Sequence, residues 1–195
     1  MQSRLFDELS TIDMNFDFTT DTKNYWEVLK DRDLSLGGGV IDPDTNSRTL
    51  RTYHRILWSR ELPNGDTLQL DDSGSMQKMY LTWNGQRFGS DSIMHTLRYP
   101  EMHDIVQQYL SRYPNPRKFM EECIRTGYTI GGMIIFPKWH GGMNQSRGVN
   151  HIIKDRWDRT LECIRRHYAG ETSPLSGVCE KDSWFYDLFV DFKGY

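Results

Sequence analysis

Cysteine is scarce in this sequence. Its 195 residues contain three cysteines, Cys123, Cys163 and Cys179, which are widely separated and form no Cys-x-x-Cys pair. An odd number of cysteines at such spacing indicates neither a disulfide framework nor a thiolate zinc site. We therefore predict free thiols, a reducing cytoplasmic setting, and a protein that needs no metal and no cofactor.

Long apolar runs and targeting signals are also missing. The longest apolar run, Met133 to Phe136, is far shorter than the roughly 20 residues that span a bilayer. The N-terminal stretch MQSRLFDELS lacks the basic segment and the apolar run of a secretion signal. We expect neither secretion nor membrane insertion.

The common catalytic motifs are absent as well. The sequence has no Gly-x-Ser-x-Gly, His-Glu-x-x-His, Walker or zinc-finger spacing, which excludes the usual hydrolase and nucleotide-binding signatures. Gly37, Gly38 and Gly39 are followed by no phosphate-binding motif, so they indicate a flexible turn. Candidate sites must therefore come from residues that the fold brings together.

The chain has no overall excess of positive charge. Its net charge of −3 argues against a protein whose whole surface binds nucleic acid. The charge is nevertheless uneven, because residues 1–46 hold ten Asp or Glu against four Lys or Arg. Residues 143–168 hold six Lys or Arg against three acids, a local balance of +3. That basic segment is the natural place to look for an anion site.

What the sequence does contain is enough apolar material for one core. It is 37% hydrophobic and 13% aromatic, well above the content of a disordered chain. We predict one domain over residues 1–195 with an α+β fold, in which an antiparallel sheet has helices packed on one side.

The clearest β signal is the Asn84-Gly85 dipeptide. Alternating apolar residues precede it, and Asn-Gly favours the tight turn of a two-residue hairpin. We therefore predict a hairpin from Met79 to Phe88. Elsewhere, apolar periodicity and turn residues predict strands at 14–18, 68–70 and 128–136, and helices at 50–60, 100–110, 115–127 and 184–192.

Apolar faces are predicted for the first three of these helices. Alternation from Ile56 to Leu62 also permits a strand in place of the end of the first helix. The residues expected to face the core are Leu50, Tyr53 and Leu57 in the first helix, Met102, Ile105, Val106, Tyr109 and Leu110 in the second, and Phe119, Met120, Cys123 and Ile124 in the third.

The most informative stretch is Met143 to Tyr168, which we predict to be a helix with its preceding loop. Five residues at helical spacing make a stripe that should face the core: Ile153, Trp157, Leu161, Ile164 and Tyr168. A second face carries His151, Asp155, Asp158 and Glu162.

This second face has two interpretations. It is either a row of metal ligands or acid/base groups, or a solvated surface with ion pairs such as Asp155–Arg159 and Glu162–Arg166. Exposed helices commonly carry such pairs, so the solvated surface is the favoured interpretation.

The loop before the helix is a polar run from Asn144 to Asn150. Helix capping explains Ser146 and Asn150, but a cation such as Arg147 is disfavoured near the positive end of a helix dipole unless something negative compensates it. Arg147 is therefore either an anion-binding residue or part of a plain salt bridge.

Several of these stretches carry a resemblance. From Asn144 to Gly148, through Asp155-Arg156 and Ile164-Arg165-Arg166, to Ser173-Pro174-Leu175, the sequence resembles an uncharacterised bacterial family of unknown function. The resemblance extends to Asp42-Pro43-Asp44, Tyr53-His54, Leu57-Trp58-Ser59 and Leu62-Pro63-Asn64-Gly65. It implies a bacterial, cytosolic setting and supplies no catalytic residues.

The function that we hypothesise is nucleic-acid handling, with single-stranded RNA or another nucleic acid as the partner. Its phosphate would bind at the loop and helix start 143–155, where backbone N–H groups meet basic and amide side chains. The proposed ligand-binding residues are Asn144, Arg147, Asn150 and Arg159.

If the site also cleaves RNA, three residue types supply the chemistry. His151 would act as acid and base, Asp155 would orient it, and Arg147 would stabilise charge on phosphorus. Trp139 and Tyr168 are candidate stacking surfaces for unpaired bases.

The alternative is a protein-interaction or inhibitor module without chemistry, either phage-related or regulatory. The acidic N-terminal part and the apolar helix at 184–192 suit a protein partner. An enzyme should place His151, Asp155 and Arg147 around one concave pocket, whereas a binding module should leave them dispersed.

Overall fold

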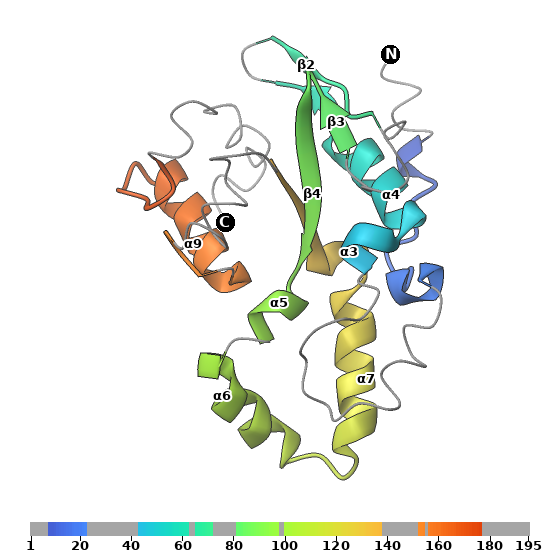
Figure 1. Cartoon of the computed structure of the whole chain (residues 1–195), viewed down its shortest axis with the longest axis vertical. Coiled ribbons are helices and arrows are strands. Elements are labelled where there is room, and N and C mark those ends of the chain that lie inside the picture. The colour runs from blue at the N-terminus through green and yellow to red at the C-terminus, as the bar shows by residue number, and fades with distance from the viewer. Residues whose placement is uncertain are drawn as a thin grey trace.

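The computed structural model describes residues 8–22, 43–62, 65–71, 81–97, 100–137, 152–154 and 156–176. These residues form an α+β fold, in which antiparallel strands are combined with separate helices (Figure 1). The predicted fold class is confirmed. The helix predicted at 184–192 lies outside the described residues.

The central sheet has three antiparallel strands in the order β3 (Leu81–Trp83), β4 (Gln86–Ser92) and β5 (Met133–Pro137). β3 and β4 form the predicted hairpin, with Trp83 paired to Gln86. Asn84 and Gly85 have φ angles of 48° and 78°, the left-handed conformations that a type I′ turn requires at both central positions. The Asn-Gly signal is therefore confirmed.

A smaller sheet consists of β1 (Arg60–Glu61) and β2 (Thr67–Leu68). It is joined to β3 through Asp71 and Thr82, each of which donates its backbone N–H to the carbonyl of the other at 2.9 Å. Leu68 and Leu70 are buried, as the predicted strand requires.

Both faces of the central sheet are covered. Ile134 and Ile135 point to opposite faces because adjacent strand residues alternate, yet both are buried. Helix α4 (Arg48–Trp58) and helix α9 (Trp157–Tyr168) lie on opposite sides of β4 (Figure 1). The expectation of helices on one side is thus corrected, because the apolar run of β5 has no polar face to leave in water.

The first predicted helix is confirmed as α4, and the alternative strand does not replace its end. Strand β1 begins only after this helix has ended. Leu50 and Tyr53 are buried as expected, but Leu57 is exposed and His54 is buried instead. The inward face is therefore centred closer to His54 than the apolar residues alone indicated.

The N-terminal strand predicted at 14–18 is wrong. Met14 is 60% exposed, and Phe18 begins a short 3-10 helix, η1 (Phe18–Asp21). The carboxylates of Asp13 and Asp17 accept hydrogen bonds from the N–H groups two residues further on, Asn15 and Thr19. Such local bonds offer the backbone an alternative to strand pairing.

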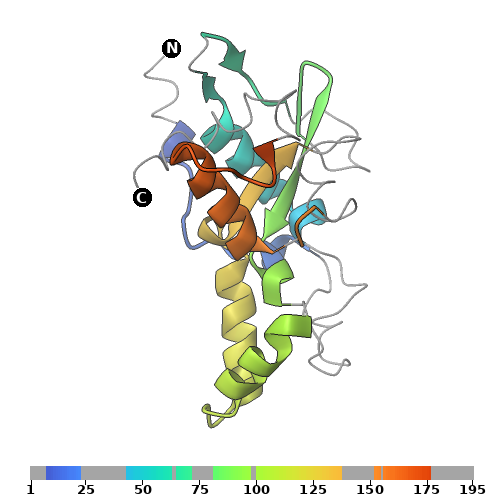
Figure 2. The same cartoon turned by 90° about the vertical axis from the view of Figure 1, so that its left-hand side faces the viewer.

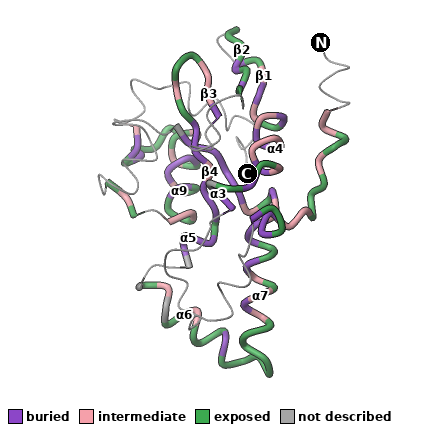
Figure 3. The backbone as a smooth tube through the Cα atoms, turned by 45° about the vertical axis from the view of Figure 1, so that its right-hand side comes forward, coloured by how far each residue is buried: buried purple, intermediate pink, exposed green. Residues whose placement is uncertain are grey.

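Two longer helices extend away from the sheet at one end: α6 (Pro100–Leu110) and α7 (Pro116–Gly127) (Figure 2). The predicted inward positions are partly wrong, because Ile105 and Tyr109 of α6 are exposed. In α7, Met120 and Ile124 are buried as expected. Figure 3 shows this division, with buried residues concentrated in the sheet and exposed residues along α6 and the outer part of α7.

The strand predicted at 128–136 starts later than expected. Residues Ile130–Gly132 form the short helix η2, and β5 begins at Met133. A Cβ added to Gly132 would clash with the carbonyl oxygen of Gly127. The backbone of Gly127 is therefore a close neighbour of Gly132, and only glycine fits at this position.

Helix α9 is shorter than the predicted helix. Residues 152–154 are not helical, and Arg156 has an extended backbone with φ of −123° and ψ of 124°. Helix α9 begins at Trp157, whose N–H donates to Oγ1 of Thr96 at 2.7 Å. A continuous helical face from residue 151 to Glu162 therefore does not form.

The predicted core stripe is largely confirmed, because Ile164 is buried and Ile153, Trp157 and Tyr168 pack against the same hydrophobic cluster. Thr160, Cys163 and Ile164 are buried, whereas Leu161 is 41% exposed. Cys163 and Ile164 join the hydrophobic cluster that contains Phe136 and Leu175. The expectation that Leu161 lies in the core is wrong, because the helix presents the small residues Thr160 and Cys163 to the core instead.

Two further sequence predictions concern thiols and membranes. Cys123 and Cys163 are free thiols, and Cys179 lies outside the described residues. Of the helices that the structure describes, none combines the length and the apolar character needed to cross a membrane.

Candidate functional site

Most of the sequence-predicted site lies outside the described residues. This applies to Asn144, Arg147, Asn150, His151 and Asp155, so their grouping stays a prediction. Arg159 is described, and it is an exposed residue near the start of α9.

Part of the predicted acidic face is an ion-pair network on α9. Glu162 accepts hydrogen bonds from Arg165 at 2.8 Å and from Arg166 at 2.9 Å, and Arg165 also binds Glu171. Hydrogen bonds from the two arginines lower the pKa of Glu162 to about 2. The predicted Glu162–Arg166 pair is confirmed, and this part of the face is a solvated surface.

Much of the local positive charge has a carboxylate partner. Besides the two arginines paired with Glu162, Lys154 forms an ion pair with Glu101, and Arg156 donates from Nε to Asp158 at 3.0 Å. Within the described residues, Arg159 makes no ion pair with an acidic side chain. The +3 balance of this segment therefore overstates the charge that is available to an external anion.

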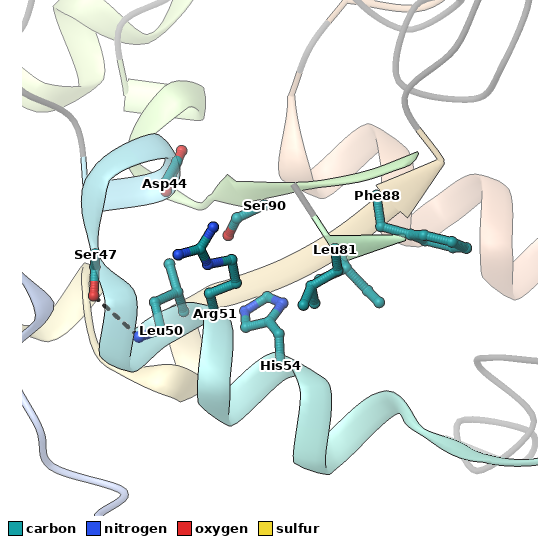
Figure 4. A pocket seen from close by; sticks show the side chains of 9 residues that line it. Asp44, Ser47, Leu50, Arg51, His54, Leu81, Phe88 and Ser90 are labelled. Atoms are coloured by element: carbon teal, nitrogen blue, oxygen red, sulfur yellow. Dashed lines mark hydrogen bonds between the residues drawn. The ribbon is translucent and has the colours of Figure 1, made fainter. Parts of the chain in front are cut away.

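A different set of polar residues surrounds a cleft between α4 and β4 (Figure 4). The cleft is tight, with a cavity volume of about 10 Å³, which is about the space that one water molecule needs. Helix α3 (Pro43–Asn46) and the strands β3 and β5 complete its walls. The lining residues are Asp44, Ser47, Leu50, Arg51, His54, Leu81, Phe88, Ser90 and Ile135.

The start of α4 fixes the position of the helical lining residues. Ser47 is the N-cap, and its Oγ accepts the N–H of Leu50 at 3.0 Å. Asp21 of η1 binds the same helix end, accepting from the Ser47 hydroxyl at 2.8 Å and from the N–H of Thr49 at 2.9 Å. Arg51 and His54 are three residues apart, so both face the cleft from adjacent turns.

Asp21 behaves as a charged anchor for this helix end. Burial alone would raise the pKa of its carboxyl, but the hydrogen bonds from Thr49 and Ser47 outweigh burial and lower the pKa below its ordinary value. The carboxylate is therefore ionised at neutral pH and compensates the positive end of the α4 dipole.

The strand side of the cleft supplies one hydroxyl. Ser90 and Phe88 are two residues apart on β4, so both side chains point to the same face of the sheet. Ser90 is paired with Ile135 of β5, which lines the cleft beside it. A polar group is thereby placed within an otherwise apolar wall.

His54 is the most unusual residue of the cleft. Its side chain is 1% exposed, and neither Nδ1 nor Nε2 has a hydrogen-bond partner in the described structure. Burial lowers its pKa to about 3, so the imidazole is neutral at pH 7. Neutral imidazole offers one donor and one acceptor, and leaving either buried and unpaired costs about 1–3 kcal/mol.

Two neighbours of His54 also present polar atoms to the cleft. Nη1 of Arg51 and Oγ of Ser90 are buried and have no hydrogen-bond partner in the part of the chain that the structure describes. In Figure 4 the guanidinium of Arg51 lies between Asp44 and Ser90, and the ring of His54 lies beside it. The cleft thus contains one cation, one carboxylate, a neutral imidazole and a hydroxyl.

The polar groups of this set are donors and acceptors of hydrogen bonds. With its pKa lowered to about 3 by burial, His54 is neutral near pH 7, keeps one N–H as a hydrogen-bond donor, and is a weak base. Among the described residues, no group of three or more His, Cys, Asp or Glu side chains is placed to hold a metal ion. The cleft can donate and accept hydrogen bonds at atoms that are themselves buried.

Sequence reasoning did not select these residues as a site. Asp44 and His54 lie in stretches that carry the family resemblance, but Arg51 and Ser90 belong to no recognised motif. The usable signal was the position of His54, four residues after Leu50 on the apolar side of a helix.

Comparison with known proteins places the chain in a family. Residues 12–195 match the family of unknown function DUF6994, and the chain belongs to this family. The resemblance to an uncharacterised family is thereby confirmed. No solved structure matches the chain.

Proposed function

We propose that this protein binds a small ligand and that the cleft between α4 and β4 receives an anionic group of that ligand. The observation that carries the proposal is the buried imidazole of His54, whose two nitrogens have no partner in the described structure. Native proteins pair nearly all such groups, so an unpaired group inside a cleft points to something that occupies it.

An anion suits the neighbours of His54. The guanidinium of Arg51 presents a buried nitrogen without a partner, and hydrogen bonds between a guanidinium and an anion are roughly twice as strong as neutral ones. Ser90 and neutral His54 can each donate one further hydrogen bond. Three donors therefore line the same cleft.

Thermal unfolding in the presence of anions tests this proposal. Acetate and inorganic phosphate, compared with chloride at equal ionic strength, are suitable probes. An anion at ten times its dissociation constant should raise the unfolding temperature by roughly 3–5 °C. The increase should disappear in Arg51→Met and persist in Arg48→Met, which removes an exposed arginine from the same helix.

The result that overturns the proposal is equally definite. If neither acetate nor phosphate stabilises the wild type beyond chloride, the cleft holds ordered water and no anion. If both anions stabilise Arg51→Met as well as the wild type, the anions bind elsewhere.

A second proposal retains the nucleic-acid function predicted from the sequence. Residues 143–155 and Arg159 would bind the phosphate backbone, and His151, Asp155 and Arg147 would carry any RNA cleavage. The observation that favours it is the exposed Arg159, which makes no ion pair with the described residues, unlike Arg156, Arg165 and Arg166.

A further inference from the structure

We propose that one face of α6 binds the same face of a second copy of this chain, so that two molecules associate through antiparallel α6 helices. This outer face consists of Asp104, Ile105, Gln108, Tyr109 and Arg112, the last of which lies in the turn that follows the helix. None of these residues lines the cleft, so the inference is independent of the proposed function. The observation that carries it is a carboxylate and a guanidinium at opposite ends of the outer face, neither of which has an ionic partner in the described structure.

The two sides of α6 differ in exposure. On the inner side Leu110 is buried, and Met102 and Val106 are half-buried. On the outer face Ile105 is 46% exposed and Tyr109 is 51% exposed. These two residues are one turn apart, so their side chains adjoin on the helix surface. Because α6 and α7 extend away from the sheet (Figure 2), this apolar surface is accessible to a second molecule.

Helix geometry sets the positions of the residues on the outer face. At 100° per residue, Ile105, Gln108 and Arg112 lie within about 60° of one another, and Asp104 and Tyr109 flank this row on either side. Eight residues separate Asp104 from Arg112, which is about 12 Å along the axis at 1.5 Å per residue. The guanidinium carbon of Arg112 lies 5.3 Å from the ring centroid of Tyr109, and this contact holds the cation on the outer face.

The charge of this surface changes sign along its length. Asp104 is the last acidic residue before Glu121, and the charged residues between them, Arg112, Arg117 and Lys118, are all basic. Arg117 and Lys118 each form an ion pair with a glutamate one turn further along α7. Within the part of the chain that the structure describes, Asp104 and Arg112 form no ion pair. One negative and one positive group therefore remain available to a partner.

An antiparallel pair of α6 helices matches these two charges. Asp104 and Arg112 each lie four residues from Gln108, so a two-fold axis beside Gln108 brings Asp104 of each chain opposite Arg112 of the other. The interface is isologous, and the ion pair forms twice. Ile105 and Tyr109 lie between the two ion pairs, where the second chain covers their exposed surfaces. A parallel arrangement would place like charges opposite each other, which disfavours it.

The turn after α6 holds the outer face in position before association. The ring of Tyr113 stacks on Phe119 of α7, with centroids 3.8 Å apart and an interplanar angle of 16°. Leu110, at the end of α6, is buried. A surface that is already ordered loses less conformational entropy when it binds.

The size of the outer face determines the strength of association. Helix α6 has 11 residues, and one face of it is smaller than the roughly 800 Å² per partner of a standard interface. We therefore expect weak, reversible dimers with a dissociation constant of roughly 100 μM.

Sedimentation equilibrium of the full chain at increasing concentration tests the inference. The average mass should rise from 23.0 kDa towards twice that value, and added salt should lower it, because salt screens exposed ion pairs. Arg112→Glu and Asp104→Lys should each weaken association about tenfold, since each replaces two attractive pairs by two repulsive ones. The double variant carries both changes, which exchanges the signs, and it should associate like the wild type.

Arg87→Glu is the matched control. It makes the same change of net charge as Arg112→Glu at an exposed residue of β4, next to the β3–β4 turn, which lies at the other end of the molecule from α6 (Figure 1). This variant should associate like the wild type. Circular dichroism establishes that all variants are folded.

Three results overturn the inference. The first is a wild type that stays monomeric at about 500 μM, where mass action with the expected constant would place more than half of the chains in dimers. The second is association that persists unchanged in Arg112→Glu, which would mean that the copies meet through another face. The third is a double variant that does not regain association, because Asp104 and Arg112 would then not face each other. A monomeric wild type that binds single-stranded RNA through Arg112 would assign the outer face to nucleic acid instead.

Discussion

The hydroxyl of Ser47 donates a hydrogen bond to Oδ2 of Asp21 at 2.8 Å, although 26 residues separate the two in the chain. The same Ser47 oxygen accepts the N–H of Leu50 and so caps α4. One side chain therefore both starts the helix that carries Arg51 and His54 and attaches it to η1. The cleft depends on this attachment, because a shift of the helix end would move both residues.

The first prediction concerns this cap. Ser47→Ala should lower the free energy of unfolding by about 1–2 kcal/mol, because the first turn of α4 loses its cap. Urea denaturation measures the change. Ser111→Ala is the matched control, since its hydroxyl is exposed and binds only Gln108 within the structure described, and it should cost less than about 0.5 kcal/mol. Equal losses in the two variants would contradict the role of Ser47.

The second prediction follows from the burial of His54. Its pKa in the folded protein is about 3, compared with 6.5 for an unburied imidazole. The unfolded chain therefore binds a proton below about pH 6.5 that the folded chain does not bind. Stability from this group is complete above pH 6.5 and is lost as the pH falls towards 3, with a slope of up to about 1.4 kcal/mol per pH unit.

Urea denaturation between pH 7 and pH 4 checks this behaviour. His54→Gln lacks the titrating group, so its stability should decrease less steeply than that of the wild type over the same interval. Parallel pH profiles for the two proteins would mean that His54 is protonated normally in the folded state.

The third prediction concerns the core face of α9. Ile164→Ala should cost about 2–5 kcal/mol, because Ile164 is buried among the core residues. Leu161→Ala removes a similar side chain from an exposed position of the same helix and should cost less than about 1 kcal/mol. Thermal or urea denaturation of both variants measures the difference. A larger loss in Leu161→Ala would reverse the assignment of the buried face.

The fourth prediction tests the nucleic-acid proposal. Labelled single-stranded RNA and DNA should bind the wild type in a salt-sensitive manner, and Arg147→Ala or Arg159→Ala should weaken binding and reduce the salt dependence by about one counterion. Arg165→Ala is the control, because Glu162 and Glu171 already pair with this cation. The same incubation reports cleavage. Absence of salt-sensitive binding and of cleavage in the wild type would favour the protein-interaction alternative.

Element ends that depend on residues close together in the sequence could be predicted from the residue types alone. The β3–β4 turn follows from Asn84-Gly85, since both residues adopt positive φ. Helix α7 starts where expected because Asn115 accepts the N–H of Lys118 and Pro116 occupies the first turn. In both cases the determining atoms lie within four residues of each other.

The sequence did not predict the element ends that depend on contacts between residues far apart in the chain. Helix α9 starts at Trp157 because its N–H meets the hydroxyl of Thr96, which lies 61 residues earlier. The apolar period of the sequence continues through Ile153 and contains no sign of that contact. Helix starts that depend on tertiary hydrogen bonds are therefore the ones that periodicity misplaces.

The cleft was missed for the same reason. Arg51 and His54 look like polar residues of an ordinary amphipathic helix, and Ser90 looks like the polar member of an alternating strand. Only the packing of α4 on β4 brings them to one space (Figure 4). The predicted site around Arg147 used local charge alone, and the ion pairs of α9 show how readily such charge is neutralised by nearby carboxylates.

The reciprocal hydrogen bonds between Asp71 and Thr82 have a consequence for self-association. An exposed edge strand offers unpaired N–H and C=O groups to which a second chain can add a strand, and this is a route to aggregation. The outward N–H and C=O of Thr82 are already bonded to Asp71. Since β3 spans only Leu81–Trp83, this one residue pair blocks the middle of the strand, and the edge is protected from intermolecular sheet growth.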